Sequence, residues 1–183
     1  MDNKLLQQLY KMYQKEIYLY LFSLCRNKSI AEDLTQETFL KALLSLRSDH
    51  TNMRAWLYRV AKNLYLNYRE KEKSRVSLED IKEDLIDEQA EKSLNRLLVD
   101  ERQRILYSAL HKLPCLKREI LTLQFFCGMT QKQIASLLNI SPENVRVLAH
   151  RSKKELKIYL EENGYEIFWT NWTIQKRGAL WRP

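Results

Sequence analysis

Glycine and proline, the residues that most often interrupt helices, are scarce in this chain. Only three of each occur among 183 residues, so helices can run uninterrupted through most of the sequence. Apolar side chains recur at intervals of three and four residues, the period of an amphipathic helix, and no segment alternates as a strand does. The sequence therefore predicts an all-α protein.

Three helices are predicted in the first part of the chain. One has a broad apolar face that extends from Leu5 to Leu24. A second is predicted to begin after Ser29, because Ser29 and Glu32 have the spacing of a capping box, and to run to about Leu46. After a polar connector, a third helix is predicted from about Met53 to Glu70. Its predicted inward face consists of Trp56, Leu57, Val60, Leu64 and Tyr68.

An acidic segment separates two helical regions. It reads SLEDIKEDLIDEQAEKS and contains seven acidic residues and two lysines but few apolar ones, a composition typical of a linker. A chain of this length can form two small domains. We predict a domain over residues 1–75, a linker over 76–96, a second domain over 97–162 and a tail of unknown role over 163–183.

The second domain contains the signals of two short helices joined by a tight turn. Thr130 and Gln133 have the spacing of a capping box, and Asn139 suits the turn. Ser141 followed by Pro142 is typical of the start of the next helix. This arrangement predicts a helix-turn-helix, although a solvated helical hairpin remains an alternative at this point.

The last of these helices has two chemically different faces. Its predicted inner face consists of Val145, Ala149, Ser152, Leu156 and Tyr159. Cations with a few small side chains occupy the rest, as in a recognition helix that enters the DNA major groove. The candidate DNA-binding residues are Asn144, Arg146, Val147, His150, Arg151, Lys153 and Lys154.

The third helix carries a second candidate surface for nucleic acid. Tyr58, Lys62, Tyr65 and Arg69 follow one another at steps of four, three and four residues. If they face outward, the rings could stack on unpaired bases while the cations follow the phosphates, with Arg59 and Asn63 at the rim. The alternative is that the tyrosines pack against a neighbouring helix.

The second helix has an unusual outer face, made of Asp33, Glu37, Leu40, Lys41 and Leu44. Its inward side is already supplied by Leu34, Phe39, Leu43 and Leu46. Exposed leucines surrounded by charge indicate an interface with another protein, unless they pack on the first helix or on the linker.

Composition limits the class of protein. The net charge of +8 and the pI near 9.3 favour a polyanionic partner, either a nucleic acid or a membrane surface. Charges interrupt the N-terminal segment, so we expect no membrane span and a cytoplasmic protein. Three scattered cysteines indicate free thiols, and we expect no metal site, no cofactor and no enzyme activity.

Three segments resemble parts of one family, the sigma factors of bacterial RNA polymerase, in the extracytoplasmic-function (ECF) branch of the sigma-70 family. Residues 31–43, AEDLTQETFLKAL, resemble the helix that binds the polymerase clamp. Residues 55–70, AWLYRVAKNLYLNYRE, resemble the segment that reads and melts the minus-ten element. Residues 113–156 resemble the helix-turn-helix for the minus-thirty-five element. The resemblance covers about residues 5–75 and 97–160.

The resemblance implies a role for each segment. The residues it assigns to core polymerase are Asp33, Gln36, Glu37 and Leu40, with Lys41 and Leu44 on the same face. Those it assigns to the melted strand are Trp56, Asn63, Tyr68 and Arg69. Residues 48–52 would shape a pocket for a flipped base.

The function implied is that of a sigma factor, which directs core RNA polymerase to promoters and helps to melt them, and which is a monomer when free. Its partners would be core RNA polymerase and promoter DNA, and an anti-sigma factor is left open. The alternative function is a stand-alone helix-turn-helix regulator that dimerises on DNA.

The sequence departs from the family pattern at two sites. Asn67 stands where an aspartate is usual, and Val147 and Leu148 stand where a serine-arginine pair is usual. The second departure removes one expected phosphate contact and implies an altered minus-thirty-five preference.

Overall fold

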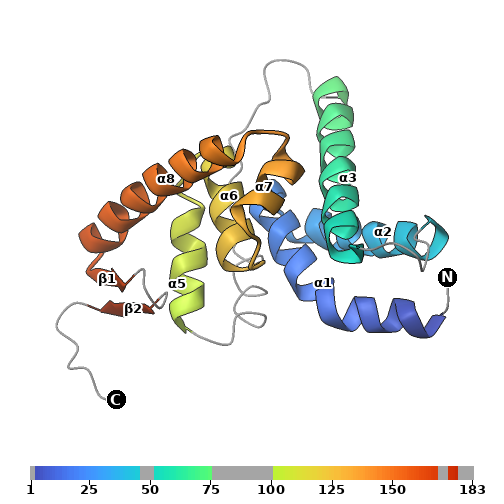
Figure 1. Cartoon of the computed structure of the whole chain (residues 1–183), viewed down its shortest axis with the longest axis horizontal. Coiled ribbons are helices and arrows are strands. Elements are labelled where there is room, and N and C mark those ends of the chain that lie inside the picture. Colours follow the sequence, from blue (N-terminus) through green and yellow to red (C-terminus); the bar gives the residue numbers. More distant parts are fainter. Residues whose placement is uncertain (1–2, 46–51, 76–100, 169–172, 177–183) are drawn as a thin grey trace. The chain divides into compact units, whose positions relative to one another are not determined.

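The computed structural model describes residues 3–45, 52–75, 101–168 and 173–176. Seven helices and two short strands occur in these residues (Figure 1): α1 Asn3–Cys25, α2 Lys28–Ser45, α3 Met53–Arg75, α5 Glu101–Leu110, α6 Cys115–Phe125, α7 Gln131–Leu138, α8 Pro142–Glu162, β1 Tyr165–Phe168 and β2 Thr173–Lys176. The predominantly helical fold confirms the prediction from the sequence.

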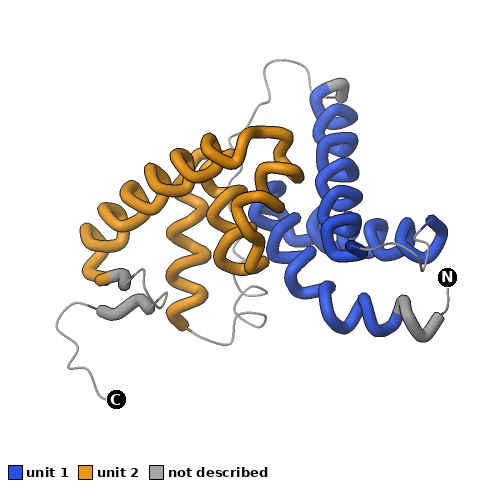
Figure 2. Tube along the Cα trace, in the orientation of Figure 1, with its two compact units in different colours: residues 1–93 blue, residues 94–183 orange. Residues whose placement is uncertain are grey.

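The chain divides into two compact units, residues 1–93 and 94–183 (Figure 2). Unit 1 contains α1, α2 and α3, and each of these helices contacts the other two. Unit 2 contains the remaining elements. The predicted linker, residues 76–96, lies outside the described residues.

The core of unit 1 is rich in aromatic side chains. Tyr20 and Tyr58 are fully buried and meet edge to face, with ring centroids 5.4 Å apart, so they join α1 to α3. Tyr10 and Phe39 make a similar contact between α1 and α2 at 4.9 Å. Such pairs add about 0.5–1.5 kcal/mol to the free energy gained from burial alone.

The turn between α1 and α2 differs from the prediction. Arg26 has a φ of 54°, the left-handed conformation that ends a helix, and its amide donates to the Phe22 carbonyl. The Asn27 side chain then accepts a hydrogen bond of 3.1 Å from the Ile30 amide. Asn27 therefore caps α2. The predicted cap, Ser29, lies two residues later, and the prediction was wrong because two residues of cap-forming type lie close together.

The helix-turn-helix of unit 2 follows the predicted signals closely. Thr130 and Gln133 form a reciprocal capping box at the start of α7. Asn139 ends α7 in the left-handed conformation, with a φ of 55°. The Ser141 hydroxyl accepts a hydrogen bond of 3.1 Å from the Asn144 amide, with Pro142 at the first helical position of α8.

A β-hairpin follows α8, in a segment where the sequence predicted no strand. β1 and β2 pair antiparallel, from Tyr165 opposite Lys176 to Phe168 opposite Thr173. Gly164, with a φ of 82°, makes the turn out of α8. β1 contacts α8 and β2 contacts α5, so part of the predicted tail packs on unit 2. Each strand has only four residues, too few for a clear alternating pattern.

Candidate nucleic-acid interface

The inner face of α8 lies where the sequence predicted it. Val145, Ala149, Ser152 and Leu156 are all buried, and Tyr159 is half-buried. α8 contacts α5, α6 and α7, so three helices support it from behind. A helix held in this way keeps a constant orientation, which a recognition helix requires.

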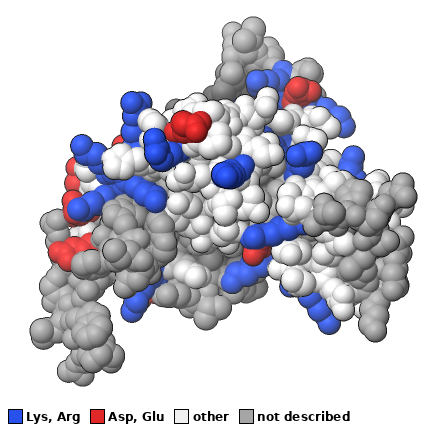
Figure 3. Space-filling model, viewed as in Figure 1, with Lys and Arg blue, Asp and Glu red and all other residues white. Residues whose placement is uncertain are grey.

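The opposite face of α8 offers cations and small side chains to solvent. Val147 is 42% exposed, which suits contact with a thymine methyl group. Figure 3 shows Lys and Arg side chains along this helix, at the upper left of the view. The predicted DNA-binding residues that the structure leaves exposed are Asn144, Arg146, Val147, His150, Arg151 and Lys154.

Lys153 lies in a different environment from these residues. Its ammonium group sits 5.6 Å from the centroid of the Phe125 ring, a cation–π contact between α8 and α6. Burial lowers the pKa of Lys153 from its usual value. This lysine is half-buried, so the structure separates it from the exposed cations with which the sequence had grouped it.

The prediction of an aromatic stripe on the outer surface of α3 is wrong. Tyr58 is 0% and Tyr65 is 6% exposed. The Tyr58 hydroxyl donates to Glu16 at 3.1 Å, and the Tyr65 hydroxyl donates to the Leu24 carbonyl at 3.0 Å. Both rings pack against α1, which is the alternative that the sequence had left open. Neither ring can stack on a base in this conformation.

Other predicted residues of α3 remain accessible. Arg59, Asn63 and Arg69 are exposed, and Lys62 is half-buried. Trp56 and Tyr68, predicted to point inward, are half-buried as well. Six of the eight predicted residues of α3 therefore remain accessible, without the two tyrosines.

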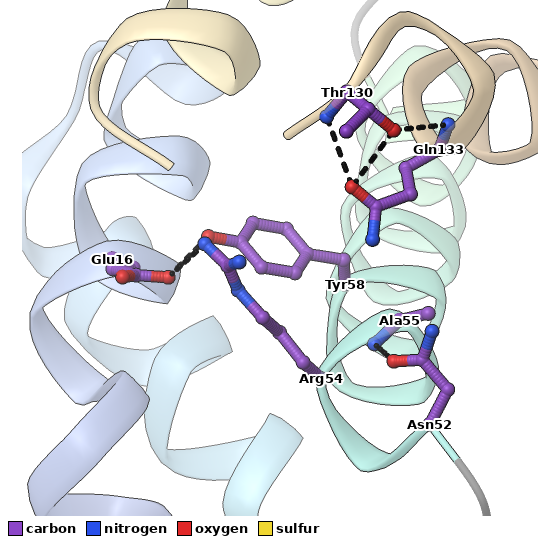
Figure 4. Close-up of polar contacts among 7 residues, drawn as sticks. All are labelled: Glu16, Asn52, Arg54, Ala55, Tyr58, Thr130 and Gln133. Carbon is purple, nitrogen blue, oxygen red and sulfur yellow. Dashed lines mark hydrogen bonds and ion pairs between the residues drawn. The ribbon is translucent and has the colours of Figure 1, made fainter. Parts of the chain in front are cut away.

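A polar network that sequence reasoning missed joins α1 to the start of α3 (Figure 4). One oxygen of the Glu16 carboxylate lies 2.9 Å from the Arg54 guanidinium and 3.1 Å from the Tyr58 hydroxyl. Burial lowers the pKa of Arg54, but the Glu16 carboxylate and the Tyr58 hydroxyl raise it by more. A cation in the first turn of a helix, where it opposes the helix dipole, was the available signal for such a partner.

The outer face of α2 is exposed as predicted. Leu40 is 54% and Leu44 is 76% exposed. Leu43, predicted to face the core, is also 39% exposed, because the buried side of α2 is formed by smaller residues such as Thr35, Thr38 and Ala42. The charged and polar residues around these leucines, all exposed, are Asp33, Gln36, Glu37 and Lys41.

Within the described ranges, His, Cys, Asp and Glu side chains form no group of three that could hold a metal ion. None of the described helices has the length and apolar character needed to cross a membrane. Cys25, Cys115 and Cys127 are free thiols.

Comparison with known proteins places both units in one family. Residues 9–75 match the family model for sigma-70 region 2, and residues 91–156 match the model for sigma-70 region 4. The ECF RNA polymerase sigma factor SigM of Bacillus subtilis (strain 168) is 32% identical over 154 residues, which are 83% of this chain and 93% of that protein. The RNA polymerase sigma factor YlaC of the same strain is 34% identical over 160 residues, which are 83% of this chain and 90% of that protein.

Two solved structures have a similar fold. CnrH, in complex with the cytosolic domain of CnrY, has a TM-score of 0.61 at 23% identity, over 88% of this chain and 91% of that one. The sigma factor RpoE of Bartonella quintana, in complex with the anti-sigma factor NepR, has a TM-score of 0.62 at 19% identity, over 85% of this chain and 96% of that one. The two region matches and the identity with SigM and YlaC show that the chain belongs to the sigma-70 family of RNA polymerase sigma factors, in its ECF group.

Proposed function

We propose that this sigma factor divides its work between its two units: unit 1 binds core RNA polymerase and opens the minus-ten element, and unit 2 reads the minus-thirty-five element. The observation that carries the proposal is the presence of regions 2 and 4, in that order, in one chain. A sigma factor directs transcription initiation and is not an enzyme. Its partners are core RNA polymerase and promoter DNA.

The exposed face of α2 is the proposed contact with core polymerase. Leu40 and Leu44 provide apolar area, and the surrounding charges would set the register of the contact. Burial of these leucines against a partner would be favourable, because it would remove their apolar surface from water.

The exposed side chains of α3 and α8 are the proposed DNA contacts. On α8, Arg146, Arg151 and Lys154 would neutralise phosphates, and Asn144, Val147 and His150 would meet base edges. On α3, Trp56, Arg59, Lys62, Asn63, Tyr68 and Arg69 would meet the melted strand. Tyr58 and Tyr65 are removed from this set because they are buried.

Two further properties belong to the proposal. Because RNA polymerase and DNA occupy the bacterial cytoplasm, we place the protein's action there. The fold neighbours are complexes with an anti-sigma factor or with the cytosolic domain of CnrY, which supports a regulator of the anti-sigma class for this chain, with the free protein a monomer. The presence of region 2 argues against the alternative of a stand-alone regulator, because such a regulator would not require a region that binds core polymerase.

The test is transcription in vitro with the purified protein, core RNA polymerase from a related bacterium and fragmented genomic DNA. We expect discrete transcript starts that require this protein and that share two sequence elements upstream. Sequence-specific DNA binding by the free protein without any such starts would contradict the sigma function and favour the regulator.

A further inference from the structure

The first turn of α3 carries a charge that its own helix disfavours. The Asn52 side chain caps this helix by accepting a hydrogen bond of 2.9 Å from the Ala55 amide (Figure 4). Arg54 follows in the first turn, where the partial positive charge of the helix end repels a cation. No acidic residue lies in that turn, so the compensation must come from elsewhere in the fold.

Glu16 of α1 provides the negative charge that compensates Arg54. Its Oε2 atom lies 2.9 Å from Arg54 Nη2 and accepts a hydrogen bond of 3.1 Å from the Tyr58 hydroxyl. Arg54 and Tyr58 are one helical turn apart, so a single carboxylate oxygen holds two successive turns of α3. The Arg54 guanidinium also lies 5.9 Å from the ring centroids of Tyr13 and Tyr58, within the range of cation–π attraction.

These contacts constrain geometry more than they stabilise the fold. The side chains of Arg54 and Glu16 are 28% and 30% exposed. Ion pairs that solvent can reach contribute little to the free energy of unfolding. Two donors on one oxygen nevertheless add a directional constraint on the first two turns of α3 against α1, beside the apolar contacts of its buried face. The residues whose orientation this controls are those that follow in the same helix.

We propose that Glu16, Arg54 and Tyr58 are positioning residues for promoter opening, which hold the first turns of α3 so that Trp56, Arg59 and Asn63 face the melted strand together. The inference rests on the proposed function of unit 1. Tyr58 is buried, and the carboxylate of Glu16 would repel a phosphate, so neither residue acts on DNA itself. The Arg54 guanidinium is held by Glu16.

The test uses the full-length protein with substitutions Glu16→Gln, Arg54→Gln and Tyr58→Phe, and the exchanged pair Glu16→Arg with Arg54→Glu. Three quantities are measured: hydrogen exchange of the α3 amides from Trp56 to Val60, where the backbone hydrogen bonds of the helix begin, in the free protein; binding to core polymerase; and permanganate reactivity of a promoter identified by transcription in vitro. Lys28→Gln is the matched control, because it breaks an exposed ion pair of the same unit, Lys28 with Glu32 at 3.9 Å.

We expect Glu16→Gln and Arg54→Gln to speed amide exchange and to lower promoter opening by about three- to tenfold, with core binding within about twofold of wild type. Tyr58→Phe should have a smaller effect in the same direction, since the charged contact between Arg54 and Glu16 remains. The exchanged pair should recover most of the opening. Lys28→Gln should leave all three quantities unchanged.

Three results would overturn the inference. Unchanged exchange in the single variants would show that the network does not hold α3. An equal loss of core binding and opening would indicate general damage to the unit. An exchanged pair that recovers amide exchange but not opening would mean that the Arg54 charge itself meets DNA. If the wild-type protein with polymerase opened no promoter, the proposed function would fail instead, and the exchange data would still decide whether the network holds the helix.

Discussion

The hydroxyl of Tyr65 donates a hydrogen bond of 3.0 Å to the backbone carbonyl of Leu24. Leu24 lies in the last turn of α1, where carbonyl groups have no partner within their own helix. The tyrosine therefore satisfies one of these carbonyls from α3 and ties the two helices together at that level.

Tyr65→Phe should lower the free energy of unfolding by about 1–2 kcal/mol, because the ring stays packed while a buried carbonyl loses its donor. Tyr65→Ala should cost about 3–5 kcal/mol, since it also leaves a cavity. Denaturation by urea, followed by circular dichroism, measures both. A Tyr65→Phe protein as stable as wild type would show that the hydrogen bond contributes nothing.

The exposed leucines of α2 give a prediction about polymerase binding. Leu40→Asp combined with Leu44→Asp should abolish co-purification with core polymerase while leaving the helical content unchanged, because both side chains already face water. Leu66→Asp is the matched control, since Leu66 of α3 is also exposed but lies outside the proposed contact. Normal co-purification of the double variant would remove α2 from the interface.

Neighbouring lysines of α8 should differ in their contribution to DNA binding. Lys154→Gln should weaken promoter binding by the holoenzyme for all sequences and reduce the slope of log affinity against log salt by about one. Lys153→Gln should change that slope less, because Lys153 packs over Phe125. If both variants reduced the slope by about one, both lysines would contact phosphates.

The parts of the structure that followed from the sequence are those determined by adjacent residues. Thr130 pairs with Gln133, and the Ser141 hydroxyl accepts from the Asn144 amide, so each cap has a partner three residues away. Local hydrogen bonds of this kind depend on little else in the fold. The two faces of α8 were predictable for a similar reason, since charge and apolarity divide clearly along that helix.

The orientation of α3 could not be predicted in the same way. Leu57 and Leu64 are buried as predicted, but the buried face also includes Ala61 and the two tyrosines. It is therefore rotated from the predicted face, whose other members, Trp56, Val60 and Tyr68, are half-buried. Ala61 is buried, but alanine is only weakly apolar, so little in the sequence indicated that this position faces the core. Tyrosine suits either a buried or an exposed site. Partners on α1 that are distant in the sequence, among them Glu16, Tyr20 and Leu24, hold these two tyrosines inside.

The turn before α8 offers a test of backbone strain. Asn139 has a φ of 55°, a conformation that asparagine and glycine tolerate better than other residues. Asn139→Ala should lower the free energy of unfolding of unit 2 by about 1 kcal/mol, whereas Asn139→Gly should stay within about 0.5 kcal/mol of wild type. Thermal unfolding of the full chain compares them, and an alanine variant as stable as the glycine variant would exclude strain at this turn.

The buried phenol of Tyr18 gives a prediction about pH. Tyr18 is 6% exposed, and its hydroxyl has no hydrogen-bond partner among the described residues. Burial, with smaller contributions from Glu32 and Cys25, raises its pKa to about 12, against about 10 in an unfolded chain. Between these two values the folded state keeps a proton that the unfolded state has lost, so stability falls as the pH rises through this window and is unaffected by the group below it.

The loss over that window should be at most about 3 kcal/mol. Tyr18→Phe removes both the titration and the unsatisfied hydroxyl, so the variant should be at least as stable as wild type at pH 7 and should lose less stability between pH 10 and pH 12. Urea denaturation at a series of pH values compares the two proteins. Parallel stability curves would mean that Tyr18 ionises equally in both states, and a less stable variant at pH 7 would mean that the hydroxyl has a partner in solution.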